Sequence, residues 1–274
     1  FLITMNNNPL VSVILSVYNG EKTIVKTIES ILSQTFADFE LIVIDNGSTD
    51  RTYEILQKFS DTDKRIKLFR NHITCTRSKA LNFGILKAAG KYIARIDADD
   101  QALPERLARQ VDYLEKHPEC GVLGSFVKEI NESGEIMPRK QNPILWEDIQ
   151  KDIFKYNPVF HPSVMMRKEV VDASGGYNED YLDAEDYELF SRLIETTRFA
   201  NIPEMLVVRF FPEKVSPVKM RTQNIEQLKI QWGMLRRRAV PWWGVFYMTK
   251  YIFTLCLPVG LREFVRRIRH RKHR

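Results

Sequence analysis

Three carboxylates stand close together in the segment "KYIARIDADD", residues 91 to 100. Asp97, Asp99 and Asp100 follow a short apolar run that is typical of a buried strand. Because like charges repel and a buried carboxylate is costly, a bound divalent cation would explain this spacing. Hard cations such as Mg²⁺ and Mn²⁺ favour oxygen ligands and often bridge substrate phosphates. The alternative is an Asp-rich turn that only caps the next helix.

The elements around this segment alternate between two periodicities. Apolar runs predict strands at 11–17, within 40–50, at 65–69 and at 91–96, and helical spacing follows at 19–36, 51–59 and 78–90. Gly90 is expected to end the third helix. Strands that alternate with helices predict a mainly parallel sheet. Ligands bind outside the carboxyl ends of such strands, so the polar turns "SVYNGE", "DNGSTD" and "DADD" should share one crevice.

The second half of the chain is less regular. Its patterns predict a helix that begins at Pro104, a strand and hairpin that turn at Ser133 and Gly134, a further strand, an amphipathic helix and a final helix. These elements are expected over residues 104–118, 121–138, 161–167, 185–196 and 223–238.

Composition bounds the class of protein. The chain has 274 residues with 44% apolar content, which suits one large domain or a domain with an appendage. Cys75, Cys120 and Cys256 are far apart and match no metal-ligand spacing, so we expect a reducing compartment and neither zinc nor a disulfide framework. The net charge of +6 lies entirely in the segment from Leu261 to the end. A neutral body argues against nucleic acid and points to a local anionic partner.

An apolar segment at 239–261 precedes this basic end and is interrupted only by Lys250. Its longest stretch without proline has 16 residues, fewer than the ~20 that a membrane span needs. Paired Trp242 and Trp243 suit the headgroup level, so we expect an interfacial or re-entrant segment on an anionic membrane surface. With no signal peptide in view, this predicts a cytoplasmic protein, peripheral on the inner face of the cell membrane. The alternative is an apolar helix that packs on the body or on a second subunit, as in a homo-oligomer.

Five segments resemble, in order, motifs of the inverting glycosyltransferases of family 2, which have the GT-A fold. They are "VSVILSVYNGEKTIVKTIESILSQTF", "FELIVIDNGSTDRT", "YIARIDADD", "HPSVMMRKEVV" and "GGYNEDYLDAEDYELFSRL", within roughly residues 9–211. The resemblance implies an α/β, Rossmann-like, mainly parallel sheet flanked by helices. It implies a GT-A glycosyltransferase domain over 1–215, with a nucleotide-sugar half at about 9–100 and an acceptor half at about 101–215. A C-terminal helical tail that associates with a membrane would occupy 216–274.

The resemblance also implies a nucleotide-sugar donor and its contacts. Val17 and Tyr18 would line the nucleoside pocket, and Asp45 would hydrogen-bond the base. Asp97 would meet the ribose or the metal, and Asp99 the metal-bound diphosphate, with Mn²⁺ or Mg²⁺ as the cation. Tyr18 as an ordinary loop aromatic and Asp45 as a helix N-cap remain the alternatives.

Catalytic roles fall on the segment "DAEDYELF". Glu185 and Asp186 open a predicted helix, where the positive end of the helix dipole stabilises carboxylates. The resemblance implies that Asp186 is the general base and that Glu185 is its orienter or alternate, with Asp183 as a third candidate. Two first-turn acids that serve only the helix dipole are the alternative. His161 could meet the diphosphate or the acceptor, and its alternative is a structural histidine. Lys79 and Arg77 could meet phosphate, and their alternative is solvated surface charge.

The function implied is a metal-dependent inverting glycosyltransferase. It would move a sugar from a nucleotide-diphosphate sugar, with UDP favoured, to a hydroxyl of a glycan or lipid-linked acceptor in cell-surface polysaccharide synthesis. A sugar nucleotidyltransferase is the first alternative, but "SVYNGEKT" holds a single Gly where a Gly-rich phosphate loop would stand. A non-catalytic membrane-bound sugar-binding protein is the second, and retention of both acidic motifs argues against it.

Three departures from the family pattern concern the donor side or its surroundings. Ser16 stands where the family usually has Pro, and Asn46 replaces the second Asp of an Asp-Asp pair. "HITCTRSKALN" differs from the common "GLSAARN". The last two line the donor side in relatives, so they bear on nucleotide and sugar preference rather than on the reaction class.

Overall fold

The computed structural model describes residues 8–131, 133–138, 140–210, 217–237 and 245–256, and divides into two compact units, Phe1–Glu213 and Lys214–Arg274. In the first unit the strands are β1 Val11–Val17, β2 Phe39–Asp45, β3 Ile66–Arg70, β4 Tyr92–Arg95, β5 Gln101–Ala102, β6 Cys120–Ile130, β7 Ile136–Met137, β8 Met165–Arg167 and β9 Arg198–Phe210. Its helices are α1 Ile24–Leu32, α2 Thr52–Thr62, α3 Arg77–Lys87, α4 Arg106–Lys116, α5 Trp146–Asp152, α6 Lys168–Ala173, α7 Glu185–Leu193 and the 3₁₀ turn η1 His161–Ser163.

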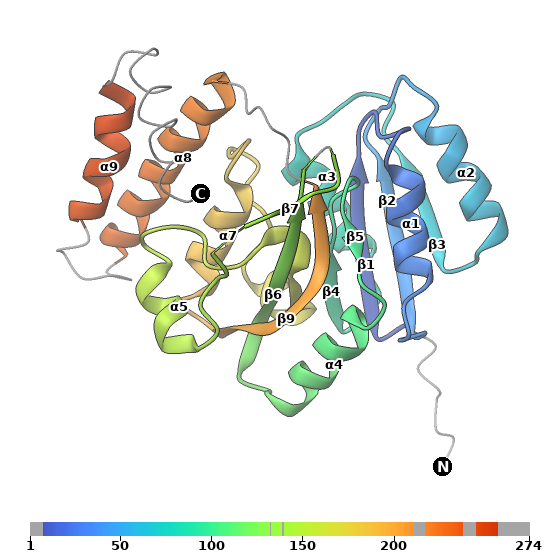
Figure 1. The fold of residues 1–274 in the computed structure, drawn as a ribbon, viewed down its shortest axis with the longest axis horizontal. Coiled ribbons are helices and arrows are strands. Elements are labelled where there is room, and N and C mark those ends of the chain that lie inside the picture. The colour runs from blue at the N-terminus through green and yellow to red at the C-terminus, as the bar shows by residue number, and fades with distance from the viewer. Residues whose placement is uncertain (1–7, 132, 139, 211–216, 238–244, 257–274) are drawn as a thin grey trace. The chain divides into compact units, whose positions relative to one another are not determined.

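The strands of the first unit form one sheet (Figure 1) in the order β3-β2-β1-β4-β8-β6-β9-β5, with β7 beside β6. β3, β2, β1 and β4 are parallel, as expected of βαβ units. β8 runs antiparallel to both β4 and β6, β6 and β9 are parallel, and β5 is antiparallel to β9. The sheet is therefore mixed, and the predicted run of neighbouring parallel strands is confirmed for β3, β2, β1 and β4.

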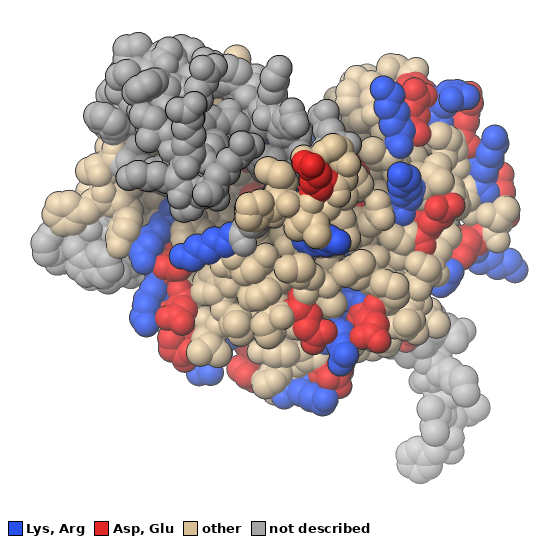
Figure 2. Space-filling model, in the orientation of Figure 1, with Lys and Arg blue, Asp and Glu red and all other residues tan. Residues whose placement is uncertain are grey.

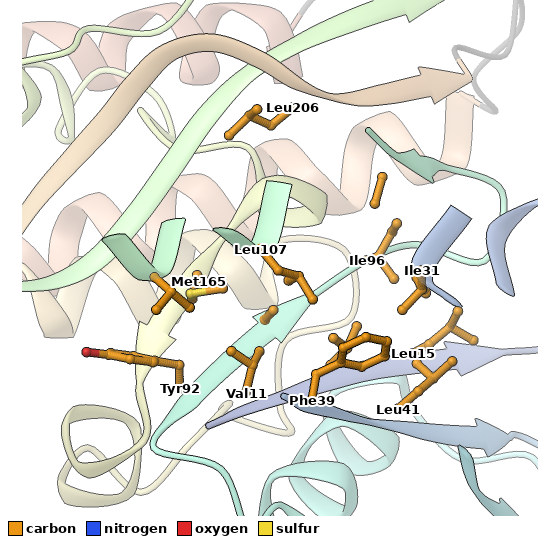
Figure 3. Close-up of a cluster of buried hydrophobic side chains, with 14 of the residues drawn as sticks. Val11, Leu15, Ile31, Phe39, Leu41, Tyr92, Ile96, Leu107, Met165 and Leu206 are labelled. Atoms are coloured by element: carbon orange, nitrogen blue, oxygen red, sulfur yellow. The ribbon is translucent and has the colours of Figure 1, made fainter. Parts of the chain in front are cut away.

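Helices cover both faces of the parallel strands, because alternate residues of a strand point to opposite faces. Val11, Val13 and Leu15 of β1 join one buried cluster with α1 and α4 residues (Figure 3), among them Ile24, Ile28, Ile31, Leu107, Val111 and Leu114. Ile14 points to the opposite face and packs against Gly84 of α3. A Cβ atom at position 84 would lie only 2.7 Å from the Cγ2 atom of Ile14. Burial of each such side chain contributes about 1.5–3 kcal/mol.

Several elements differ from the sequence prediction. α3 ends at Lys87 rather than at Gly90, whose missing side chain allows close packing: a Cβ there would lie 2.6 Å from the Ser12 nitrogen of β1. The strand expected at 161–167 is only β8, because the segment that contains Pro162 forms the turn η1. β9 was not predicted, since Pro203 argues against a strand. The pairing with β6 skips Pro203 and the next residue at an irregularity.

The second unit contains α8 Pro217–Arg236 and α9 Val245–Cys256, which pack on each other. Val245, Phe246 and Tyr247 are exposed on α9. In the part of the chain that the structure describes, no helix combines the length and apolar character required to cross a bilayer. The predicted headgroup pair Trp242 and Trp243 and the basic end lie outside the described residues.

Basic and acidic side chains are interspersed over the described surface that faces the viewer in Figure 2. Many of these residues pair with each other, such as Lys91 with Glu115 at 2.7 Å and Arg109 with Glu105 at 3.2 Å. This distribution agrees with a body of little net charge, in contrast to the single-sign stripe of a nucleic-acid-binding domain.

Candidate active site

The turns after β1 and β2 are fastened to each other. The Asn19 nitrogen donates to Ser48 Oγ at 3.0 Å, and the Thr49 nitrogen donates to Asn19 Oδ1 at 2.9 Å. Asn19 has a φ of 52°, in the left-handed region that asparagine tolerates better than most residues. In this turn Tyr18 is half-exposed while Val17 stays buried. The predicted nucleoside contacts of both residues remain predictions.

Asp45, at the end of β2, is fully buried. Its Oδ1 accepts from the Ser48 nitrogen at 3.2 Å, and its Oδ2 lies 3.2 Å from Arg70 Nε. The Arg70 guanidinium in turn stacks 4.0 Å from the Tyr53 ring centroid. Because α2 begins at Thr52, Asp45 is not its N-cap. A nucleotide base that reaches Asp45 would share this carboxylate with Arg70.

Asn46 fixes the segment after β3. Its Nδ2 donates to the Cys75 carbonyl at 2.8 Å, and its Oδ1 accepts from the Cys75 nitrogen at 3.1 Å and from Asn71 Nδ2 at 2.9 Å. An aspartate at this position could still accept from the Cys75 nitrogen and from Asn71. It could not donate to the Cys75 carbonyl. The departure from the family Asp-Asp pair therefore has a physical reason, since the amide ties residues 71–75 to the end of β2.

We expect Asn46→Asp to destabilise the protein by about 1–3 kcal/mol, because it leaves the Cys75 carbonyl without its donor and sets a negative charge against it. Urea unfolding of the two proteins measures the change. Asn178→Asp is the matched control, because Asn178 uses its side-chain oxygen to accept from the Asp180 nitrogen, which aspartate can also do. Equal stability of Asn46→Asp and wild type would contradict the role of this amide.

The acidic cluster after β4 is suited to a cation. The carboxylate oxygens of Asp97, Asp99 and Asp100 lie within 4.8 Å of one another. Asp99 is exposed, whereas Asp100 is buried and its Oδ2 has no hydrogen-bond partner. Asp100 Oδ1 accepts from the Phe210 nitrogen at 3.1 Å. An unpartnered buried oxygen within an all-oxygen donor set fits a hard divalent cation.

Arg95 is a member of this cluster that sequence reasoning missed. Its side chain is 2% exposed, and its Nη1 atom lies 2.5 Å from Asp97 Oδ1. Burial acts to raise the pKa of Asp97, but Arg95 and then Arg77 outweigh it and hold that pKa well below its ordinary value. Desolvation and the charge of Asp97 raise the pKa of Asp99, and they raise that of Asp100 well above its ordinary value. The available signal was an arginine inside the apolar run "YIARI".

Glu185 and Asp186 open α7, as predicted, and meet α3 at its first residue. Arg77 Nη1 donates to Glu185 Oε1 at 2.9 Å, and Glu185 is buried. Arg77 also lies within electrostatic reach of Asp97 and Asp186. One guanidinium therefore faces the acidic cluster after β4 and the acidic pair of α7, which brings the two predicted motifs into one site.

Asp186 accepts from two donors. Its Oδ1 accepts from the Tyr187 nitrogen at 2.7 Å and its Oδ2 from Asn157 Nδ2 at 2.8 Å. Desolvation, and next the charge of Glu185, raise the pKa of Asp186 to about 6. A carboxylate with this pKa is ionised at neutral pH and is a stronger base than an ordinary aspartate.

The remaining predicted residues lie around this centre. His161 is buried, its Nε2 lies 2.7 Å from the Tyr177 hydroxyl, and burial together with Arg95 lowers its pKa well below the ordinary value. His161 is therefore neutral at neutral pH, and it lies within electrostatic reach of Asp97. Lys79 lies half-exposed, with Nζ 3.8 Å from Glu179 Oε2. Diphosphate contacts of His161 and Lys79 remain predictions.

Comparison with known proteins identifies the family of this chain. The family model described as "Glycosyl transferase family 2" matches residues 12–175. The chain belongs to glycosyl transferase family 2 and is a glycosyltransferase. An uncharacterized glycosyltransferase of Haemophilus influenzae is 38% identical over 83% of this chain and 73% of the relative. EpsE of Bacillus subtilis is 33% identical over 94% of this chain and 93% of the relative. The O-antigen biosynthesis glycosyltransferase WbnJ of Escherichia coli is 34% identical over 72% of this chain and 78% of the relative.

Solved structures share the family fold. S. aureus TarS 1–349 in complex with UDP-GlcNAc is 20% identical, with a TM-score of 0.67 over 91% of this chain and 76% of that chain. The mannosyltransferase PcManGT of Pyrobaculum calidifontis, in complex with GDP-Man and Mn²⁺, is 18% identical, with a TM-score of 0.66 over 84% of this chain and 65% of that chain. At these identities the likeness concerns the fold alone.

Proposed function

We propose that this glycosyltransferase is a metal-dependent inverting enzyme that uses a nucleotide-diphosphate sugar, with UDP as the favoured nucleotide. Its acceptor would be a hydroxyl of a glycan or lipid-linked saccharide in cell-surface polysaccharide synthesis. The observation that carries the proposal is Arg77, which pairs with buried Glu185 and lies within electrostatic reach of Asp97 in the acidic cluster. Support also comes from WbnJ, which by name acts in O-antigen biosynthesis, and from structural neighbours with bound UDP-GlcNAc, GDP-Man and Mn²⁺.

The proposed reaction is a single in-line displacement. Asp186 takes the proton of the acceptor hydroxyl while that oxygen attacks the anomeric carbon. The bond from this carbon to the diphosphate breaks, and the nucleoside diphosphate leaves with the electron pair. Asp99 and Asp97 would hold the cation, with Asp100 beside them. The bound cation would offset the negative charge of the leaving diphosphate. Attack from the opposite face inverts the configuration of the sugar.

The other proposed contacts follow the crevice. Val17 and Tyr18 would line the nucleoside, Asp45 would meet the base, and His161 and Lys79 would approach the diphosphate. Glu185 is held by Arg77. Its negative charge would lie beside the base Asp186 and raise the pKa of that base.

We also propose that the second unit binds the anionic inner face of the cell membrane. The exposed Val245, Phe246 and Tyr247 of α9 support this placement, together with the basic end of the sequence. Sedimentation with vesicles should capture the protein when the vesicles carry anionic lipid, and capture should fall with added salt. Equal capture by neutral vesicles would contradict an electrostatic component.

A screen of nucleotide sugars tests the proposed function. UDP- and GDP-linked sugars are incubated with the protein, with and without Mn²⁺ or Mg²⁺, and release of nucleoside diphosphate is measured. We expect release that depends on one nucleotide and on the cation. Formation of a nucleotide sugar from a sugar phosphate and a nucleoside triphosphate would instead favour the nucleotidyltransferase alternative.

The proposed base predicts a pH dependence. Asp186 must be unprotonated to act, and its pKa is raised to about 6 by desolvation and Glu185. We therefore expect kcat/KM to be level well above pH 6, to reach half its maximum near pH 6 and to fall about tenfold per pH unit well below it. An aspartate with an ordinary pKa near 3.8 would keep its activity at pH 5. Rate profiles across pH 4.5 to 8, taken with stability at each pH, distinguish the two cases.

A further inference from the structure

The segment between α5 and η1 is attached to the start of α7 and to β9. The Tyr187 hydroxyl donates to the Ile153 carbonyl at 2.6 Å, and Asn201 Nδ2 donates to the Pro158 carbonyl at 2.9 Å. Tyr187 follows Asp186 directly, and both Tyr187 and Asn201 are buried. These two bonds fix the backbone on either side of Asn157.

The side chain of Asn157 is itself held in one orientation. Its Oδ1 accepts from the Val159 nitrogen at 3.2 Å, so its Nδ2 faces Asp186 Oδ2 at 2.8 Å. The Tyr187 nitrogen holds the other oxygen of Asp186 at 2.7 Å. Two donors on two oxygens define the plane of the carboxylate. Each carboxylate oxygen can accept a second bond, so a lone pair remains for a substrate hydroxyl.

We propose that Asn157 is a positioning residue for the general base: its amide orients the Asp186 carboxylate towards the acceptor hydroxyl. This inference rests on the proposed function, in which Asp186 removes the acceptor proton. Proton transfer needs the base within hydrogen-bond reach and in the right direction, and a small misplacement is costly to the rate.

The charges around Asp186 show why a neutral donor suits this position. Glu185 lies beside it on α7, Arg77 reaches it from α3 and Arg95 from β4, and the Tyr177 hydroxyl is a further titratable neighbour. A third cation, placed at position 157, would stabilise the ionised form of Asp186 and lower its pKa, which would make it a weaker base. An amide N–H fixes direction and adds no charge.

Three variants test the proposal, each studied in the full chain. Asn157→Ala removes the donor, and Asn157→Asp keeps the shape but sets a second carboxylate against Asp186. Asn131→Ala is the matched control, because among the described residues the side chain of Asn131 bonds within the β6–β7 turn, including the Ser133 nitrogen at 3.1 Å. Thermal unfolding and UDP binding in Mn²⁺ are measured for all three beside kcat and KM.

We expect kcat to fall about ten- to hundredfold in Asn157→Ala, with UDP affinity and melting temperature close to those of wild type and of Asn131→Ala. An N–H that donates to a carboxylate favours its ionised form. The pKa of Asp186, followed by ¹³C NMR of its carboxyl carbon, should therefore rise in Asn157→Ala and rise further in Asn157→Asp. The acid limb of the kcat profile should move with it.

Unchanged kcat and unchanged pKa of Asp186 in Asn157→Ala would overturn the proposal. A loss of UDP affinity and of melting temperature without a change in that pKa would also overturn it, because it would mark a purely structural asparagine. Failure of the proposed function has a different signature, since Asp186→Asn would then retain full transfer. Inactive Asp186→Asn with normal Asn157→Ala would count against the positioning role alone.

Discussion

We expect Asp186→Asn to lower sugar transfer by about 10²–10⁴-fold, the usual contribution of a general base, and to leave nucleotide binding intact. The reason is geometric as well as chemical. The carboxylate is desolvated beside Glu185, with a pKa raised to about 6, so it is the side chain best suited to take a hydroxyl proton at neutral pH. An amide of the same shape cannot take that proton.

The substitution has a structural cost that must be separated from the chemical loss. Both oxygens of Asp186 accept hydrogen bonds, from the Tyr187 nitrogen and from Asn157 Nδ2. An asparagine has one acceptor oxygen, so one donor loses its partner at a cost of about 1–3 kcal/mol. Thermal unfolding measures this part, and UDP titration in Mn²⁺ reports on the donor site.

Asp180→Asn is the matched control for the base, because Asp180 is exposed in the loop that precedes α7. Its transfer rate should equal that of wild type. If Asp186→Asn transfers sugar at the wild-type rate, the general base is another residue, and Asp183 and Glu185 are the next candidates for the same substitution.

Asp99→Asn is expected to remove metal activation. Of the three clustered aspartates, Asp99 is the one whose replacement leaves the fold least disturbed, because Asp97 pairs with buried Arg95 and Asp100 is itself buried. Metal stabilisation of a leaving group is worth several kcal/mol, so transfer should fall about a hundredfold or more. Added Mn²⁺ should not restore it.

The binding readout makes this prediction independent of turnover. In wild type, UDP affinity should rise when Mn²⁺ is added and fall again with a chelator. In Asp99→Asn the affinity should stay near the chelated value under both conditions. Asp38, an exposed aspartate just before β2, provides the control: Asp38→Asn should respond to Mn²⁺ like wild type. A full Mn²⁺ response in Asp99→Asn would remove Asp99 from the cation site.

The parallel half of the fold was predictable because each of its strands and helices follows a simple periodicity. β1 and β2 are buried on both faces and read as continuous apolar runs, which is typical of parallel strands. The mixed half was less predictable. β9 carries Pro203, and only the irregular pairing with β6 shows how the strand accommodates it.

The candidate site divides in the same way. Asp97, Asp99, Glu185 and Asp186 stand in motifs whose order along the chain could be recognised. Their partners could not, because the contacts join distant parts of the sequence. Arg77 and Glu185 are 108 residues apart and Asn157 and Asp186 are 29 apart, and neither pair lies within one element. Local periodicity contains no information on such pairs.

Arg77 also has a consequence for engineering of donor preference. It is the first residue of α3 and lies two residues beyond the segment 71–75 that Asn46 ties to the end of β2. A loop exchange at 71–76 designed to admit another nucleotide would shift the residue that pairs with Glu185. Designed libraries in that loop should therefore keep position 77 and the length of the loop constant, or selectivity and turnover will change together.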